Sequence, residues 1–299
     1  MHVNTSAAPR GVQAPGNLLY AFIISRHGQR TPIMCCKNLP KNVPEDHGQL
    51  TKAGREQTFK LGQCLRARYK GFLEAGKRDQ LLATHTRIQR CRESMNETVR
   101  GLAVPTVTPP EVDPTRYDLL FQASLIENID AVLQAPGQEK REKFLVMDSL
   151  MTYVSIGNPI PVWAKPIWND LIAADRKIFG LALSGNELWY AANVLGRVEE
   201  TLAQKFEKGV QRPDRMHVFS MSDSSVYSTL KLLNHSYDDH PGFCASVFFE
   251  VFEDSSKVKR VQVLSTVAEE APQLVAMDKL KNPCELKEFL DFLRAILKN

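Results

Sequence analysis

Two arginines and a histidine follow an apolar stretch near the start of the sequence. Arg26, His27 and Arg30 come directly after residues 18–24, which read LLYAFII, so a buried strand is predicted to end beside them. Arginine binds phosphate through a planar fork of donors and stays charged at any relevant pH. Two arginines keep a histidine between them neutral, so that a ring nitrogen can attack phosphorus. The stretch therefore predicts a pocket for a small phosphorylated or other anionic compound, with His27 as the nucleophile.

A serine and an aspartate follow a second apolar stretch. Ser222 and Asp223 come after residues 216–221 and directly before the helical pattern of residues 224–233. Breaking a phosphate ester leaves an alkoxide that an acid must protonate, and Asp223 is the best-placed carboxyl group for this step. Aspartate is also favoured at the start of a helix, so capping is a second role for Asp223 that does not exclude the first.

Short apolar stretches alternate with stretches of helical periodicity, which favours a parallel sheet joined by crossover helices. Ligands of such sheets bind beyond the carboxyl ends of the strands, where residues far apart in the sequence meet. We therefore predict an α/β fold: a three-layer, doubly wound, mostly parallel sheet with helices on both faces and an inserted, mainly helical cap. The predicted strands are 18–25, 80–84, 216–221 and an antiparallel pair, 247–252 and 258–264. The predicted helices are 51–75, 90–102, 138–153, 165–180, 186–208, 224–233 and 286–297.

Prolines recur between residues 104 and 165 and break that part of the sequence into short pieces. We predict that residues 104–165 form the cap, inserted into an α/β core made of residues 17–103 and 166–299. Loops and insertions carry much of the specificity of such folds, so the irregular loop 32–50 and the cap are expected to select the substrate.

The composition narrows the function classes. The net charge of +4 is spread along the chain without a long basic tract, so nucleic acid is not a predicted partner. No run of 18 apolar residues occurs, so no transmembrane segment is predicted. None of the six cysteines lies in a CxxC pair and no Cys/His cluster has zinc spacing, so no metal site is predicted.

The sequence leaves the compartment and the oligomeric state open. Cysteines without an evident pairing pattern slightly favour the reducing cytoplasm. A secreted or lysosomal protein from which a signal peptide has been removed is the alternative, and three N-glycosylation sequons fit it. A homodimer is compatible with the sequence.

The stretch from Arg26 to Pro32, RHGQRTP, resembles the RHGxRxP signature of the histidine phosphatase superfamily, in its histidine acid phosphatase branch. The resemblance implies a phosphohistidine intermediate on His27 and phosphate binding by Arg26 and Arg30. It also implies acid catalysis by Asp223 and no cofactor. Further stretches that resemble the family are 48–55, 61–69, 161–164, 216–225 and 284–289.

Two further assignments depend on this resemblance. Arg90 matches a phosphate-binding arginine that the family follows four residues later with a serine, here Ser94, and Arg87 is the alternative. Cys284 matches a cysteine that the family pairs with another one four residues earlier. Leu280 stands at that earlier position here, so a free thiol is predicted at Cys284.

The chain departs from the family at one position of the site. The family carries a histidine-aspartate pair with the histidine on the phosphate, whereas this chain has Ser222 before Asp223. Ser222 offers a hydroxyl as a weak phosphate ligand but no positive charge. Losing one preorganised donor costs a transition-state site about 10²–10³ in rate. No replacement is evident, because His217 lies inside a strand and His235 follows a helix, which leaves His85 in the loop after the second strand.

Two functions are compatible with this pattern. The first is an acid phosphatase-like phosphomonoester hydrolase with a phosphohistidine intermediate, weakened by the loss of the second histidine. The second is an impaired family member that binds an anionic or phosphorylated ligand, or performs altered chemistry in the same pocket. A protein without any anion site is disfavoured because the two arginines, His27 and Asp223 remain.

Overall fold

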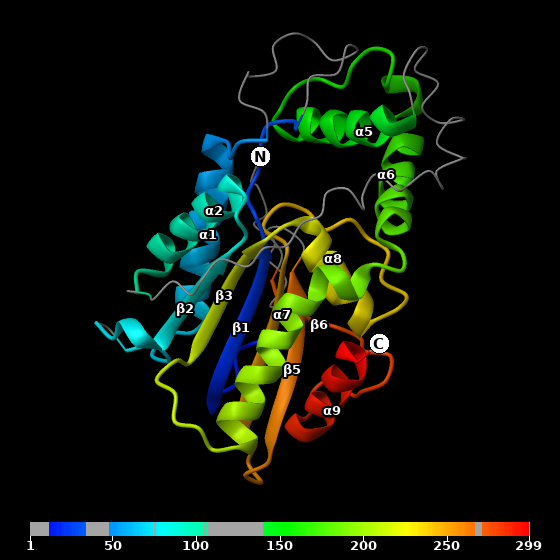
Figure 1. Ribbon diagram of the computed structural model, residues 1–299. Coiled ribbons are helices and arrows are strands. Elements are labelled where there is room, and N and C mark those ends of the chain that lie inside the picture. Colours follow the sequence, from blue (N-terminus) through cyan, green and yellow to red (C-terminus); the bar gives the residue numbers. More distant parts are fainter. Residues whose placement is uncertain are drawn as a thin grey trace, which may run out of the picture.

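The computed structural model describes residues 12–33, 48–74, 76–104, 106, 140–266 and 271–298. These residues form one mixed, seven-stranded sheet (Figure 1). In sheet order its strands are β2 (Leu81–His85), β3 (Met216–Met221), β1 (Leu18–Arg26), β4 (Ser246–Glu253), β5 (Lys259–Thr266) and β6 (Gln273–Leu274), with β7 (Cys284–Glu285) also paired to β5. β2, β3 and β1 run parallel, whereas β4 and β5 are antiparallel to their neighbours. The predicted α/β class and the late antiparallel pair are confirmed.

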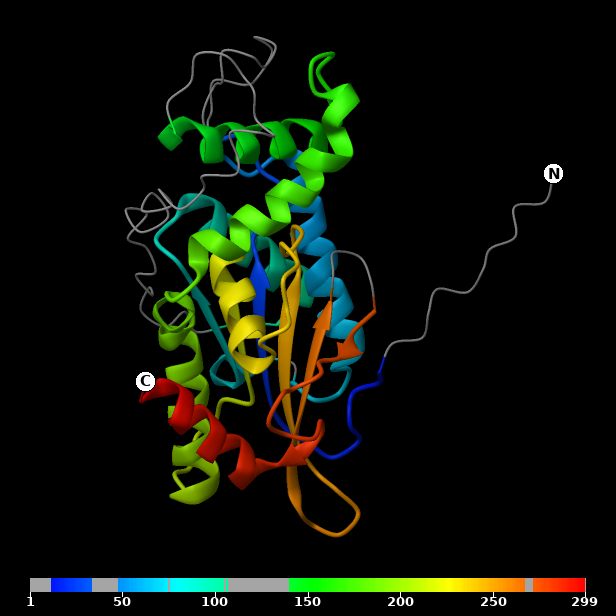
Figure 2. The ribbon, with the colours of Figure 1, turned by 90° about the vertical axis from the view of Figure 1, so that its right-hand side faces the viewer.

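The described helices are α1 (Lys52–Arg68), α2 (Gln89–Leu102), α5 (Lys140–Ser155), α6 (Trp168–Leu183), α7 (Glu187–Leu202), α8 (Asp223–Leu233) and α9 (Leu286–Leu297), with the short turns η1 (Arg78–Gln80), η2 (Lys165–Ile167) and η3 (Ala203–Glu207). α1 and α2 pack on one face of the sheet, and α7, α8 and α9 pack on the other (Figure 2). The predicted three layers are thus confirmed. α5 lies beyond the end of the sheet at which β1 and β3 end, and α6 descends from it toward α8 (Figure 1).

β1 is buried on both faces because its side chains alternate between two apolar clusters. Tyr20, Phe22 and Ile24 pack with α7 and α9 in one cluster. Ala21 and Ile23 pack with α1 and α2 in the other. A strand between two neighbouring strands and two helix layers needs an uninterrupted apolar sequence, which is the pattern that β1 carries. Its central position places the residues after β1 at the middle of the sheet edge.

Most predicted elements agree with the structure to within a few residues. α1 begins after Thr51, whose side chain accepts a hydrogen bond from the N–H of Gly54 (2.9 Å), as expected for an N-cap. The helix ends at Arg68 rather than near residue 75, because Gly71 follows with a positive φ of 80° that helical backbone does not adopt. α7 is also shorter than predicted, because its last residues continue as the π-helical turn η3.

α5 and α6 share an apolar cluster that is separate from the two clusters of the sheet. Met147, Leu150 and Tyr153 of α5 contact Leu171 of α6 in this cluster. Much of the predicted cap, residues 107–139, lies outside the described residues. The domain boundaries at 104 and 165 therefore stay a prediction.

Cys284 is buried on β7 as a free thiol, as predicted. None of the helices in the described ranges is long and apolar enough to cross a membrane. The same ranges contain no group of three His, Cys, Asp or Glu side chains that could hold a metal ion.

Candidate active site

The residues after β1 are fixed to both neighbouring strands. The N–H of His27 donates to the carbonyl of Met221 at the end of β3 (3.0 Å), and its carbonyl accepts from the N–H of Cys244 just before β4 (3.3 Å). Gly28 lies so close to α1 that an added Cβ would stand 2.3 Å from the carbonyl oxygen of Gly54. Only glycine fits this contact, so the turn that carries His27 packs directly onto the start of α1.

The two ring nitrogens of His27 have different partners. Nδ1 donates to the carbonyl of Gly28 (2.8 Å), which places the ring proton on that nitrogen. Nε2 therefore keeps its lone pair and accepts a hydrogen bond from Nε of Arg90 (3.0 Å). Burial lowers the pKa of this imidazole well below its usual value, and the charges of Arg90, Arg26 and Arg30 lower it further. The ring is thus neutral, with Nε2 available as a nucleophile.

The structure brings all three predicted phosphate-binding arginines to this site. Arg26 and Arg30 are buried at and just after the end of β1, and Arg90 extends from the start of α2 to His27. Arg30 forms an ion pair with Asp148 of α5 (2.5 Å), so this helix contacts the motif. The alternative, Arg87, is exposed on the loop before α2. The geometry therefore favours Arg90 over Arg87.

The Arg26 guanidinium lies between a carboxylate and an aromatic ring. Its Nη2 pairs with Oδ2 of Asp223 (2.7 Å), and its Nη1 donates to the carbonyl of Pro241 (2.5 Å). The guanidinium also lies over the ring of Phe243, 4.4 Å from its centroid. Its Nε is buried and bonds no atom of the described residues. Burial lowers the pKa of Arg26, and the charge of Asp223 offsets this only in part.

Asp223, the first residue of α8, is held as a carboxylate. Its Oδ1 accepts from the N–H of Ser224 (2.9 Å), and its Oδ2 faces Arg26. Burial raises the pKa of Asp223, but the nearby charges of Arg26 and His240 outweigh this and hold the pKa well below its usual range. Both roles that the sequence suggests are compatible with the geometry, because one oxygen bonds the start of the helix and the other faces the arginine.

Ser222 is buried at the N-terminus of α8. Its hydroxyl oxygen lies 2.7 Å from that of Ser224 and 3.4 Å from that of Ser225. The hydroxyl is therefore bonded within the first turn of the helix, and no positive charge enters the site at position 222.

His240 is a site residue that the sequence patterns do not indicate. It lies in the loop between α8 and β4, with Nε2 3.6 Å from Oδ2 of Asp223. Its Nδ1 bonds Asp175 of α6 (2.9 Å), and its ring stacks on Phe179 at 3.9 Å between centroids and 12° between planes. The sequence contained one indirect indication of His240. The strand after its loop, β4, pairs with β1 in antiparallel fashion, so β4 begins at the sheet edge where β1 ends, and the loop before it lies near the site.

The three histidines weighed as replacements for position 222, of which the sequence left only His85, have other partners. They form these hydrogen bonds: His217 with Thr84 (2.7 Å), His85 with the carbonyl of Thr86 (2.8 Å) and His235 with Asp278 (2.6 Å). His217 is thereby held inside the sheet, and His235 on the exposed surface.

Comparisons with known proteins identify the family. No family model matches the chain. The lysosomal acid phosphatase of Homo sapiens is 35% identical to it in an alignment 329 positions long, which covers 92% of this chain and 77% of that protein. The chain belongs to the histidine acid phosphatase family. The testicular acid phosphatase of Homo sapiens is 26% identical over 290 residues, which cover 79% of this chain and 67% of that protein.

Solved structures share the fold of this chain. The phytase of Citrobacter braakii superposes with a TM-score of 0.69 at 17% identity, over 94% of this chain and 98% of that one. The apo form of Hafnia alvei phytase superposes with a TM-score of 0.70 at 16% identity, over 95% and 98%. At these identities the likeness shows the α/β architecture alone.

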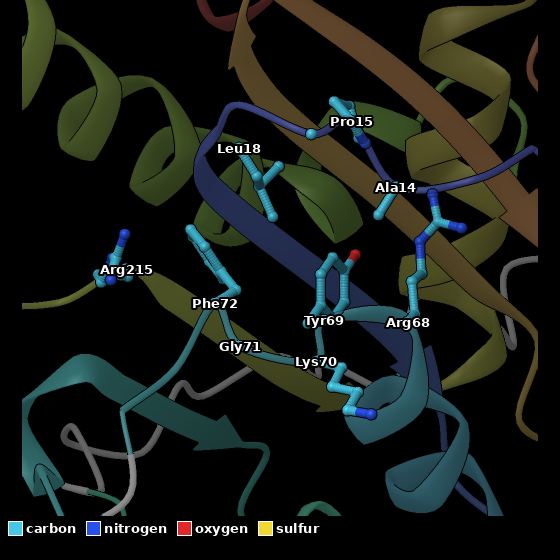
Figure 3. Close-up of a pocket in the computed structure, with 10 residues that line it drawn as sticks. Ala14, Pro15, Leu18, Arg68, Tyr69, Lys70, Gly71, Phe72 and Arg215 are labelled. Atoms are coloured by element: carbon cyan, nitrogen blue, oxygen red, sulfur yellow. The ribbon is translucent and has the colours of Figure 1, made fainter.

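A separate pocket lies at the start of β1 (Figure 3), whereas the motif that begins at Arg26 lies at the end of this strand. It has a volume of about 390 Å³ and is lined by Leu18 at the start of β1 and by Arg68 and Tyr69 at the end of α1. Arg215 also lines it, with its guanidinium 4.6 Å from the ring centroid of Phe72. Because His27 and the three arginines around it gather at the other end of the sheet, this pocket is not the candidate active site.

Proposed function

We propose that the protein hydrolyses small organic phosphomonoesters through a phosphohistidine formed at Nε2 of His27. The state of this nitrogen carries the proposal: it is buried, unprotonated and bonded to Arg90 (3.0 Å), a side chain suited to phosphate. Membership of a family that includes acid phosphatases supports the same reaction.

In the first step the substrate phosphate takes the place that Arg90 now holds against His27. Arg26, Arg30 and Arg90 bind its non-bridging oxygens and neutralise the charge that develops on them. Nε2 then attacks phosphorus, and the bond from nitrogen to phosphorus forms as the ester bond from phosphorus to oxygen breaks. The leaving alkoxide takes a proton from Asp223 and departs as the alcohol.

In the second step water hydrolyses the phosphohistidine. The Asp223 carboxylate accepts a proton from the attacking water as the bond from nitrogen to phosphorus breaks. Inorganic phosphate leaves, His27 regains its lone pair at Nε2, and Asp223 is again protonated for the next cycle.

Asp223 must hold a proton when substrate is bound, although it is ionised in the empty site. A bound phosphate draws Arg26 to its own oxygens and adds negative charge beside the carboxylate. Both effects raise the pKa of Asp223, because the charged form loses its partner and gains a like-charged neighbour. A lower pH favours the protonated acid, so turnover is expected to rise toward acidic pH.

Hydrolysis of p-nitrophenyl phosphate by the purified full chain tests this proposal. His27→Ala removes the nucleophile and is expected to lower kcat by at least about 10⁴-fold. His235→Ala is the control, because His235 is exposed and bonds Asp278 on the surface. A folded wild-type protein without turnover at acidic pH contradicts the proposal.

Ser222 favours a second function. Its hydroxyl bonds that of Ser224, so position 222 does not provide the cation that the family places there. The pocket would then bind an anionic or phosphorylated ligand without rapid turnover. Thermal unfolding with phosphate, vanadate or tungstate tests this alternative, which predicts stabilisation of the protein by anions without hydrolysis.

We further propose that α5 contributes to substrate selection. Asp148 of this helix pairs with Arg30, and the side chain of Gln29 donates to the carbonyl of Ser155 at the end of α5 (2.7 Å). These contacts place α5 over the motif that begins at Arg26, where a substrate would enter. The predicted cap of residues 104–165, which includes α5, is therefore the region to exchange in a search for substrate preference.

A further inference from the structure

His240 lies where the site otherwise lacks a cation. Position 222 carries a serine whose hydroxyl bonds Ser224, so α8 brings no positive charge to a bound phosphate. His240 arrives from a different segment, the loop before β4, and its Nε2 stands 3.6 Å from Oδ2 of Asp223. This aspartate directly follows position 222. The loop before β4 therefore places an imidazole close to where the family motif has its histidine.

Two residues of α6 hold this imidazole in place. Asp175 bonds Nδ1 (2.9 Å), and Phe179 stacks on the ring face (3.9 Å). With Nδ1 bonded to Asp175, the opposite nitrogen is directed at Asp223. Nε2 is buried, and within the described ranges it has no hydrogen-bond partner. A buried donor without a partner is costly to keep, which is explained if a ligand supplies the missing acceptor.

The charged groups around the ring favour the imidazolium form. Asp175 on α6 and Asp223 on α8 face it with negative charge, whereas Arg26 on β1 opposes its protonation. Burial by itself lowers the pKa of His240, but the hydrogen bond to Asp175 and the nearby carboxylate of Asp223 outweigh it, so the pKa is raised. Under acidic conditions the ring is therefore a second cation beside Arg26.

We propose that His240 is the second histidine of the phosphate pocket, whose protonated Nε2 donates to a phosphoryl oxygen of the bound substrate. This inference rests on the proposed function, because it names a further residue of the same site. The cation comes from the loop before β4 instead of from residue 222. A donor preorganised for the charge of the transition state is worth about 10²–10³ in rate, which is the contribution expected of His240.

Hydrolysis of p-nitrophenyl phosphate by single variants of the full chain is the first test. His240→Ala is expected to lower kcat/KM by about 10²–10³. His240→Gln, which keeps an N–H donor without the charge, is expected to lose less. His235→Ala, a change of an exposed histidine in the same loop, is expected to leave kcat/KM unchanged. A His240→Ala variant as active as the wild type overturns the inference and leaves the proposed function intact.

The variant Ser222→His separates a role on the phosphate from a role in holding the loop. In the His240→Ala background it restores the family pattern and is expected to raise kcat/KM at least about tenfold, since one charged donor is regained. In the wild-type background it is expected to change little, because the cation is already present. A large gain in the wild-type background, with none in the His240→Ala background, overturns the inference.

Anion binding keeps the inference testable even if the wild type does not turn over substrate. Tungstate is expected to raise the thermal unfolding temperature of the wild type at acidic pH, and His240→Ala is expected to lose most of this increase. Equal increases in the two proteins overturn the role of His240. An absence of hydrolysis alone contradicts only the proposed function.

Discussion

Two arginine-carboxylate pairs, Arg68 with Glu250 and Arg26 with Asp223, differ in how many of their polar atoms form hydrogen bonds. Arg68 of α1 binds Glu250 of β4 through Nε to Oε1 (2.6 Å) and through Nη2 to Oε2 (2.8 Å). The hydroxyl of Tyr69 donates to Oε1 (2.6 Å), and the amide of Gln262 donates to Oε2 (2.6 Å). Burial opposes the charge of Arg68, but the hydrogen bonds and charge of Glu250 outweigh it, so the pKa of Arg68 is raised.

The pair of Arg26 and Asp223 is incomplete by comparison. One contact joins the two side chains (2.7 Å), while Nε of Arg26 and Nε2 of His240 bond no atom in the part of the chain that the structure describes. Burial lowers the pKa of Arg26, opposite to the direction at Arg68. An anion that only accepts hydrogen bonds, such as a phosphate ester, would satisfy both donors. A fully bonded network stabilises the fold, whereas buried donors without partners are the pattern expected where a ligand binds.

Breaking the complete network is expected to have the largest effect on stability. Glu250→Ala leaves the partly buried charge of Arg68 without its partner and should lower the free energy of unfolding by about 3 kcal/mol. Urea denaturation followed by circular dichroism measures this change. Glu253→Ala is the control on the same strand, because the ion pair of Glu253 with the exposed Lys257 (3.0 Å) contributes at most about 1 kcal/mol. An equal loss of unfolding free energy in Glu250→Ala and Glu253→Ala would contradict a special role of the Glu250 network in stability.

An arginine-to-lysine substitution is expected to lower activity in one pair and stability in the other. Arg26→Lys keeps the charge but loses the planar fork, so kcat/KM should fall by about 10²–10³. Arg68→Lys should leave kcat/KM close to that of the wild type and lower the free energy of unfolding by about 1–3 kcal/mol. Kinetics and urea denaturation of both variants check this. A loss of activity in both, or in neither, would break the comparison.

The incomplete network is expected to depend on pH in a range where the complete one does not. His240 has a raised pKa, so the imidazolium is fully present below the usual value of 6.5 and is lost as pH rises through the raised value. Asp175, Asp223 and Arg26 face it, and the pKa of Asp223 is held far below this range. Stabilisation by sulfate, whose charge is constant here, should weaken across this range by about 1.5–3 kcal/mol, the value of a hydrogen bond to a charged group. Thermal unfolding of the wild type and of His240→Ala measures it, and a pH-dependent loss of the same size in both would contradict the assignment.

Removing one hydroxyl from the complete network is expected to have the smallest effect. Tyr69→Phe deletes one donor to Glu250 while Arg68 and Gln262 remain. The free energy of unfolding should fall by about 1 kcal/mol, and kcat/KM should not change. Urea denaturation together with p-nitrophenyl phosphate kinetics checks both statements. A loss of activity would show that this network also serves the site.

The elements and the position of His27 at the end of a buried strand were predictable from the sequence, because both depend on local patterns. The apolar run of β1 requires burial on both faces, and Arg26 and His27 stand at its carboxyl end, where ligands of such sheets bind. Asp223 was accessible to the same reasoning, because it follows the apolar run of β3. Each of these inferences uses residues that are close together in the chain.

The partners of the site residues were not predictable because they depend on packing between distant segments. His240 reaches Asp223 only because Asp175 and Phe179 of α6 hold its ring, and no periodic pattern of its own loop indicates this. Glu250 likewise stands in a predicted strand, but the Arg68 that neutralises it lies 182 residues away. Contacts of this kind follow from the fold and cannot be inferred before it is known.

The central position of β1 has a consequence for protein synthesis. Ala21 pairs with Met216 of β3, and Ser25 pairs with Ser246 of β4, so both neighbours of β1 are made long after it. At a synthesis rate of about 5–20 residues per second, roughly 10–45 s pass between the translation of His27 and that of the end of β4. Pairing over such separations is also slow in itself. Arg26 and His27 are therefore synthesised before the rest of the site but acquire their surroundings late, and a ribosome that stops before β4 releases a chain in which β1 lacks one of its two neighbouring strands.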